Sequence, residues 1–501
     1  MPLPKSSDQS WPPDLGEGLN RDLAEWAAWY SGDTLGLGNY YEPVSRTRKE
    51  ASNSLTARQR FWGRRGNELS GSRVRLHVPV ASDIAATSAD LLFGEEIEIT
   101  IREAHEERAS SESIATQDRI DDIYDKTGLA NLLLEGAEVC AGIGGVYLRP
   151  AWDLELASHP LLYVHHQDVA VPEWRNDILY AVTFWQTLRV DGQTVVRLLE
   201  RHEPGHIETG VYVGTEGKLG TRGNLANYEE TKQLTEDYQL PPEFGKRLLV
   251  SYIPNVRPHR RLRHLPIGRP DFAGAEGLMD AIDETYSSLM RDIRLGQSRV
   301  IVAQEALQRK GRGQGATFNV DQEVFTGLNM EPGVGDPITP IQFLIRTTEH
   351  LETAMNLFEQ TVTLAGYSKQ TFGMAVDGQA ESGTALRVKE GKTLRTNAKK
   401  ARYWESGIEQ TVENLLLIDR VILQNTDIMP VRPVVNCADV IAQNPLEVGQ
   451  AITLFRQAKA ASIETAVRLA QPELDEQAIK EEVQRIKDED SIVADPTGGF
   501  V

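Results

Sequence analysis

Two glycine-rich stretches are the residues best suited to bind a nucleotide. Residues 378–384 (GQAESGT) have the glycine spacing of a phosphate-binding loop but lack its lysine, which must reach the β and γ phosphates. Residues 140–145 (CAGIGG) precede a strand pattern, whereas a dinucleotide-binding fold requires a helix there. We therefore expect no nucleotide chemistry and interpret the second stretch as a tight turn between a helix and a strand.

Residues that could hold a metal or act as acids and bases form no convincing pattern. His165 and His166 precede Asp168, but neighbours on a strand point to opposite faces and no H-E-x-x-H motif supports them. Cys140 and Cys437 have no further cysteine with which to build a zinc site. The 73 acids make a chance carboxylate pair uninformative, and no G-x-S-x-G elbow occurs. We expect no metal, no cofactor and no enzymatic activity.

The composition indicates a folded, acidic chain. Its 501 residues are 40% hydrophobic and 25% charged, which predicts two to four structural regions with sizeable cores. A net charge of −20 argues against a protein that grips nucleic acid over its whole surface, but it allows DNA to slide past. No apolar run reaches the length of a membrane helix and the start lacks the apolar core of a signal peptide, so we expect no membrane partner.

The first half of the chain reads as a mixture of helices and strands. Residues 73–80 (RVRLHVPV) alternate as in a half-buried strand, and Ile97, Ile99 and Ile101 repeat the pattern. Helices are predicted at 20–30 and 115–140, and 214–245 reads as a polar loop. Further strands separated by short turns predict an antiparallel meander, at 177–190, 194–200, 206–213 and 247–253.

The second half reads as long helices around a small insertion. A helix at 276–296 precedes an α/β segment at 297–343, which opens with RVIVA and contains the turn KGRGQG. A helix at 347–365 ends at Gly366 and is predicted to place Leu351, Ala354, Met355, Phe358 and Val362 on one face. After a glycine-containing loop, one helix from 384 to 423 would span about 60 Å, and two or three short helices follow before a strongly acidic end.

This order of elements resembles that of tailed-bacteriophage portal proteins of the siphovirus type. Local sequence agrees at 278–290 (LMDAIDETYSSLM), 364–373 (LAGYSKQTFG) and 380–386 (AESGTAL), and the resemblance covers about 265–425. It implies an α+β portal-protein fold. Its regions are an α/β wing (1–264), a first stem helix (265–296), a small α/β clip insertion (297–343), a second stem helix (344–366), a tunnel loop (367–383), a long spine helix (384–428) and a helical crown with an acidic tail (429–501).

The resemblance also implies a function and a set of partners. Portal proteins form a ring, twelve-fold in the assembled family, at one capsid vertex, through which double-stranded DNA is packaged and ejected. Expected partners are other copies of the chain, that DNA, the terminase large subunit, a head-completion or adaptor protein, and the major capsid and scaffolding proteins. The expected location is the virion, after assembly in the host cytoplasm.

Candidate site residues follow from the same resemblance. The DNA-facing set in the tunnel loop is Ser368, Lys369, Gln370, Thr371 and Ser382, with the alternative that Lys369 is a solvated loop charge. The clip's glycine turn offers Arg309, Lys310 and Arg312 for docking the terminase and head-completion proteins. A basic group at the wing–stem junction is expected to meet acids of a neighbouring subunit, namely Arg257, Arg260, Arg261 and Arg263.

Two other classes of protein stay open. Another non-enzymatic virion assembly protein, such as an adaptor or capsid component, would lack paired helices around an insertion. A hydrolase or nuclease with an acid-based metal site would need clustered carboxylates in a pocket.

Overall fold

The computed structural model describes residues 3–4, 6–13, 15–16, 18–38, 40, 76–102, 110–295, 299–302, 308–309, 316–317, 338–341, 345–374, 383–437, 445–471 and 476–493. Contacts divide the chain into two units. The first comprises 1–376 and 390–437, and the second 377–389 and 438–501. The described part of 438–501 contains three helices, in agreement with the sequence: α11 (Pro445–Gln457), α12 (Ile463–Ala470) and α13 (Glu476–Val493).

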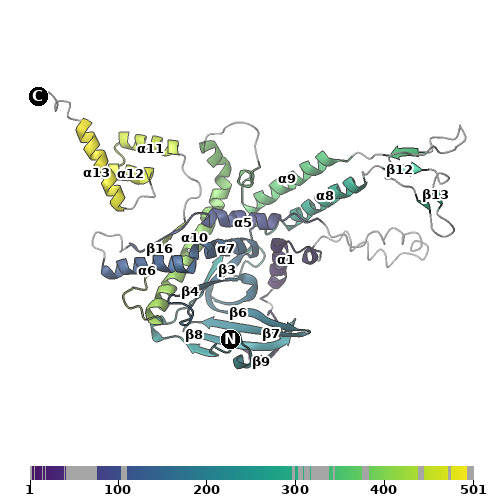
Figure 1. Cartoon of the computed structure of the whole chain (residues 1–501), viewed down its shortest axis with the longest axis horizontal. Helices are drawn as coiled ribbons and strands as arrows, with labels where there is room; N and C mark the ends of the chain where they lie inside the picture. The colour runs from purple at the N-terminus through teal and green to yellow at the C-terminus, as the bar shows by residue number, and fades with distance from the viewer. Residues whose placement is uncertain are drawn as a thin grey trace. The chain divides into compact units, whose positions relative to one another are not determined.

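A seven-stranded antiparallel sheet confirms the predicted meander at 177–190, 194–200 and 206–213 (Figure 1). The fourth strand predicted for it, at 247–253, corresponds to β11 (Ser251–Pro254), which pairs with β3 in another sheet, so that part of the prediction was wrong. The strand order is β1-β9-β8-β7-β6-β5, with β10 paired to β8. The prediction that 214–245 is a loop was wrong, because β9, β10 and two short 3-10 turns lie there. The strands are β1 (Ser6–Ser10), β5 (Ala170–Arg175), β6 (Ile178–Asp191), β7 (Thr194–Glu203), β8 (His206–Thr215), β9 (Lys218–Gly223) and β10 (Asp237–Gln239).

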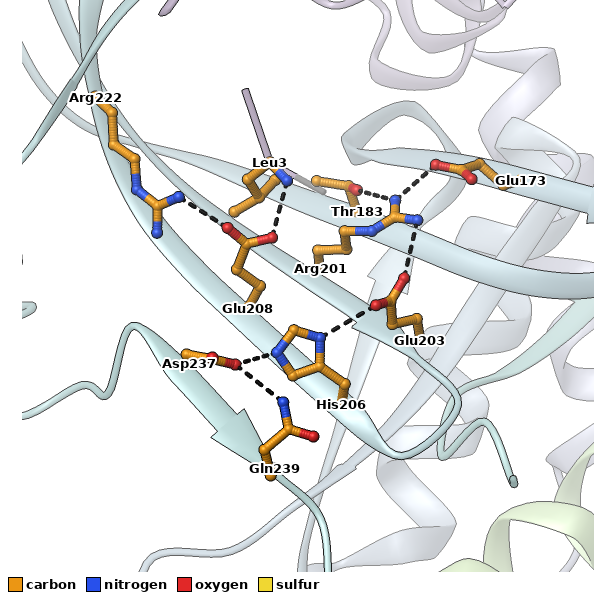
Figure 2. A network of polar contacts seen from close by, with 10 residues as sticks. All are labelled: Leu3, Glu173, Thr183, Arg201, Glu203, His206, Glu208, Arg222, Asp237 and Gln239. Atoms are coloured by element: carbon orange, nitrogen blue, oxygen red, sulfur yellow. Dashed lines mark hydrogen bonds and ion pairs between the residues drawn. The ribbon is translucent and has the colours of Figure 1, made fainter. Parts of the chain in front are cut away.

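Charged side chains tie the strands of this sheet together (Figure 2). Arg201 of β7 is 3% exposed and donates to Glu173 of β5 at 2.6 Å and to Glu203 at 3.3 Å. His206 lies between Glu203 and Asp237 of β10. Burial lowers the pKa of His206, but hydrogen bonds with the two carboxylates outweigh burial and raise the pKa. These contacts hold β5 and β10 to the centre of the sheet.

Helices and a second, smaller sheet form the largest core. Its strands are β3 (Gly145–Ala151), β4 (Leu161–His166) and β11 (Ser251–Pro254), in the order β11-β3-β4. A further pair joins β2 (Glu98–Thr100) to β16 (Val434–Asn436), so 429–437 folds with the first unit rather than with the predicted crown. The helices that pack on these strands are α5 (Val80–Phe93), α6 (Ser111–Thr127), α7 (Leu129–Ile143) and α10 (Gly383–Val421).

Two local predictions for the first half were wrong. The helix expected at 115–140 is two helices, because Gly128 adopts a φ of 61° that ends α6 and starts α7. The strand expected at 73–80 is absent over 76–79, and α5 begins at Val80; residues 73–75 lie outside the described residues. The backbone there is bonded by side chains of α8, since Val78 N donates to Asp283 at 2.8 Å and Leu76 N to Ser287 at 3.0 Å.

Two antiparallel helices flank the insertion. They are α8 (Glu276–Leu295) and α9 (Thr347–Ala365), and they run side by side (Figure 1). Residues 265–275 precede α8 without being helical, so the helix is shorter than the region 265–296. The insertion between them shows the strand pairs β12 (Arg299–Val302) with β15 (Ile338–Ile341) and β13 (Gln308–Arg309) with β14 (Ala316–Thr317).

The long helix predicted from residue 384 onward is present as α10, the longest helix of the described residues, and it ends at Val421 rather than at 428. Its 39 residues correspond to about 58 Å. Trp404, Ile408 and Leu415 of α10 are buried, whereas Ala398 is exposed. Near the N-terminus, α1 (Leu19–Ser31) and α2 (Thr34–Leu37) pack in a second core with α5 and the bases of α8 and α9.

Two glycines of α10 give a matched pair of stability tests. A Cβ at Gly407 would lie 2.5 Å from Cγ1 of Ile253 in β11, so Gly407→Ala should lower the free energy of unfolding by about 1–3 kcal/mol. A Cβ at Gly391 would have no atom within 4 Å, so Gly391→Ala should raise the free energy of unfolding by about 0.5–1 kcal/mol. Denaturant unfolding followed by circular dichroism measures both; equal effects would contradict the close packing of α10 on β11.

Candidate functional site

The turn that follows α9 is built from hydroxyl groups. Gly366 ends α9 with a φ of 104°, and a 3-10 turn (Lys369–Phe372) follows. Ser368 and Thr371 lie 2.9 Å apart by their hydroxyl oxygens, and both reach the hydroxyl of Thr393 on α10, at 3.2 Å and 2.8 Å. The Ser368 amide also donates to Thr393 Oγ1 at 2.9 Å. The turn is therefore fastened to α10 at both of its ends.

A buried charge pair lies next to this turn. Lys400 of α10 and Asp271, which precedes α8, form an ion pair with side chains 1% and 0% exposed. Lys400 Nζ also donates to Ser88 Oγ of α5 at 2.6 Å, and Tyr367 OH donates to Asp271 Oδ2 at 2.8 Å. Asn255 completes the group, donating to Asp271 Oδ1 at 2.9 Å.

The arrangement of this polar group indicates a structural role. Each polar side chain in it has a hydrogen-bond partner within the group, as a buried charge requires. Burial and the neighbouring Asp271 carboxylate raise the pKa of Tyr367 well above its ordinary value, which keeps the phenol a donor. The group thus connects α5, α10 and the bases of α8 and α9.

A cavity of about 420 Å³ opens beside the buried pair. Its walls come from the segment after β11, the C-terminal end of α9 and the middle of α10. Basic residues predominate in the lining: Arg257, Arg269, Lys392, Arg395, Lys399 and Arg402. Two basic groups that are far apart in the sequence therefore meet in one place, and the arrangement is suited to binding anions.

Sequence comparison assigns the family. The family model described as phage portal protein, SPP1 Gp6-like, matches residues 23–494. The chain belongs to this family. Among solved structures, a chain from the neck of the native GTA particle, computed with C12 symmetry, shares 12% identity at a TM-score of 0.36, covering 81% of this chain and 88% of that chain. No curated protein sequence matches.

The predicted tunnel-loop residues of this portal protein lie in different environments. Ser368 is 8% exposed, so its hydroxyl serves the contact with α10. Lys369 is half-buried and its Nζ lies 3.0 Å from Glu359 Oε1 of α9, so it is not a fully solvated loop charge. Gln370 and Thr371 are partly exposed, and Ser382 lies outside the described residues.

The junction residues have different surroundings, and the clip group is described only in part. At the junction, Arg261 pairs with Asp22 of α1 and donates to the Gly18 carbonyl at 3.0 Å, whereas Arg257 faces the cavity. Arg260 and Arg263 are exposed. In the insertion, Arg309 belongs to β13, while Lys310 and Arg312 lie outside the described residues. Among the described members of these groups, Ser368 and Thr371 contact each other, whereas Arg257 and Arg261 have different surroundings.

The two histidines considered for metal binding are neighbours on β4, but their side chains lie in different environments. His165 stacks on Phe184 at 4.2 Å, and burial together with Arg149 lowers its pKa to about 4, while His166 is exposed. Across the described residues, no group of three histidine, cysteine or acidic side chains is arranged to hold a metal ion. Nor does any described helix have the length and apolarity to cross a bilayer.

Sequence reasoning missed the buried pair and the cavity. Asp271, Tyr367 and Lys400 are separated by up to 129 positions, and each is a common residue type. One signal was available, because Lys400 lies four positions before the buried Trp404 and therefore on the same face of α10.

Removing the lysine tests how much the buried pair stabilises the fold. Lys400→Met should lower the free energy of unfolding by about 3–5 kcal/mol, because Asp271 is left buried without its counter-charge. Adding Asp271→Asn should recover part of the loss. The matched control is Lys246→Met, because Lys246 is exposed. This control should change the free energy of unfolding, measured with denaturant, by less than about 0.5 kcal/mol.

Proposed function

We propose that this chain forms a closed ring of about twelve copies at one capsid vertex, through which double-stranded DNA is packaged and ejected. The family match supports a phage portal role. The observation in the fold that most favours a ring is the surface of the two stem helices, α8 and α9. In the isolated chain, these helices expose large apolar side chains.

The exposure of these helices differs from face to face. Ala354 and Val362 of α9 are buried, at 3% and 0% exposure. Apolar side chains on other faces of the two helices are 38–58% exposed: Met290, Ile293, Leu351, Met355 and Leu364. Of the residues predicted to share one face of α9, Val362 is therefore buried in the isolated chain, whereas Leu351 and Met355 are exposed. Apolar groups at this density are expected to be covered by neighbouring stem helices.

The two stem helices are held as a pair by polar contacts near the insertion. Asp292 near the end of α8 accepts from Arg346 at 3.0 Å and lies 3.1 Å from His350 Nε2 of α9. Hydrogen bonds from both residues lower the pKa of Asp292. A pair that is fixed at both ends can present one continuous apolar surface to the next copy.

The DNA-facing part of the channel is proposed to include the turn after α9. The turn offers DNA only a few polar side chains, those of Lys369, Gln370 and Thr371, and some of these already have partners within the chain. Each phosphate contact adds affinity, so a wall with sparse cations permits DNA to slide, whereas a continuous basic wall would hold it. The overall charge of −20 is consistent with such a passage. Ser368 is a positioning residue in this proposal, and Ser382 remains a sequence-based candidate.

The regions keep their proposed roles of wing, stem, clip, tunnel loop, spine and crown. The proposed partners are the terminase large subunit, then a head-completion or adaptor protein, with major capsid and scaffolding proteins around the ring. The proposed location is the virion, with assembly in the host cytoplasm. The proposed role requires no cofactor and no enzymatic activity of the chain.

The clip proposal is tested by reversing its charge. Arg309→Glu with Lys310→Glu and Arg312→Glu should leave ring formation unchanged and abolish binding of the purified terminase large subunit, measured by surface plasmon resonance on preformed rings. Terminase binding at unchanged affinity would show that these residues do not dock it.

Ring closure is the decisive test of the proposed function. The purified full chain should form a closed oligomer of about twelve subunits with a central hole, measured by native mass spectrometry and electron microscopy of end views. A chain that stays monomeric or dimeric across the concentration and salt range of assembly would contradict the portal role.

A further inference from the structure

The cavity beside the buried pair concentrates positive charge without compensation. Six basic residues line it: Arg257, Arg269, Lys392, Arg395, Lys399 and Arg402. The single acid in the lining, Asp271, already pairs with Lys400. Like charges at this density repel one another, so the cavity is most stable when an anion occupies it.

Most of these cations have no partner within the described chain. Arg257, Arg395, Lys399 and Arg402 make no hydrogen bond or ion pair with another described residue. Lys392 donates only to the Thr363 carbonyl, which is neutral. Arg269 Nε is buried without a hydrogen-bond partner in the described residues, and burial, followed by the charge of Arg260, lowers the Arg269 pKa. These donors are available to an outside acceptor.

The shape of the cavity favours carboxylates over a DNA duplex. A volume of about 420 Å³ admits a few side chains, and part of its wall is apolar, from Leu364 and Ala365. A duplex could touch only the rim, because its backbone cannot enter a concavity of this size. A protein segment bearing several carboxylates can enter and pair with the arginines in the wall.

The chain itself has a matching acidic face. It comprises α6 and the turn between α5 and β2, where the described residues 94–102 and 110–127 contain eight acids against three basic residues. Five of these acids are exposed and make no side-chain ion pair or hydrogen bond with another described residue: Glu95, Glu96, Glu98, Asp118 and Asp125. We call this surface the acidic face.

The acidic face and the cavity lie on different sides of α10. Asn397 donates to the Leu91 carbonyl at 2.8 Å, so its side of α10 meets the end of α5, next to the acidic face. Lys399 lines the cavity, and two positions along a helix differ in direction by about 160°. A copy that presents its cavity to one neighbour can therefore present its acidic face to the other.

We propose that in the ring the acidic face of each copy enters the cationic cavity of the next copy. This proposal rests on the proposed function, because it requires a closed ring. The contact is head-to-tail and uses two different surfaces of one chain, which is the arrangement that closes by rotation. Carboxylates of the partner complete the hydrogen bonds that Arg269 and its neighbours lack.

Charge reversal with compensation tests the contact in the full chain. Lys399→Glu with Arg402→Glu should raise the protein concentration needed for half-assembly by roughly tenfold or more, measured by native mass spectrometry and sedimentation. Adding Asp118→Lys with Asp125→Lys should restore assembly, because the ion pairs can form again with the two charges exchanged between the surfaces. Circular dichroism and thermal melting of each variant show whether the subunit is folded.

A matched control reverses two charges away from the cavity. Lys246 is exposed, and Arg189 is 68% exposed in a surface pair with Asp191, so Lys246→Glu with Arg189→Glu should leave the half-assembly concentration within about twofold of wild type. A comparable loss in this control would mean that net charge alone weakens assembly, which overturns the specific contact.

The outcomes separate this contact from the portal role. Wild-type protein that forms no ring contradicts the proposed function itself. Wild-type rings together with equally stable Lys399→Glu/Arg402→Glu rings leave the portal role standing and overturn the contact. Rings of that variant that assemble normally but lose DNA passage, without recovery by the lysine substitutions, would assign the cavity to DNA.

Discussion

The buried pair of Lys400 and Asp271 is the constraint on which the centre of this chain depends. A charge in a medium of low polarity is tolerated only when each of its donors and acceptors finds a partner in good geometry. Here the partners come from α5, the segment before α8 and the segment after α9, so satisfying one lysine fixes the positions of three other segments. The bases of α8 and α9 are thereby set against α10.

The packing around that pair reinforces the same geometry. Gly407 lets α10 approach Ile253 of β11 more closely than any side chain would allow, and Asn255 follows β11 directly into the buried group. Thr393, about two helical turns before Lys400 on α10, binds the turn after α9. The stem is consequently rigid where it joins the core. Its outer turns, where Leu351 and Met355 are exposed, depend on neighbours for burial.

The sequence predicted those parts of the fold that are set by local chemistry. The meander followed from alternation and short turns, and the end of α9 from Gly366, whose φ of 104° suits glycine. Alternation misled at 76–79, because side chains of α8, rather than a neighbouring strand, bond that backbone. The site was less predictable. The cavity joins Arg257 to residues of α10 more than 130 positions later, and periodicity has no means of showing that two basic groups converge.

The distribution of charge links the two levels of the structure. Copies that each carry a net charge of −20 repel one another at long range, so assembly needs local attraction strong enough to overcome that repulsion. The apolar stem helices supply attraction but do not fix the relative position of two copies, because one apolar turn can take the place of the next. In the proposed contact, the cations of the cavity and the exposed acids of the acidic face supply register, because a misaligned copy leaves both groups unpaired. Salt therefore has opposite effects on the two contributions: it screens the general repulsion between copies and weakens the specific contact. The subunit number of the ring is expected to be most uniform at the salt concentration where these two effects balance. The stem helices alone would permit closure at several subunit numbers.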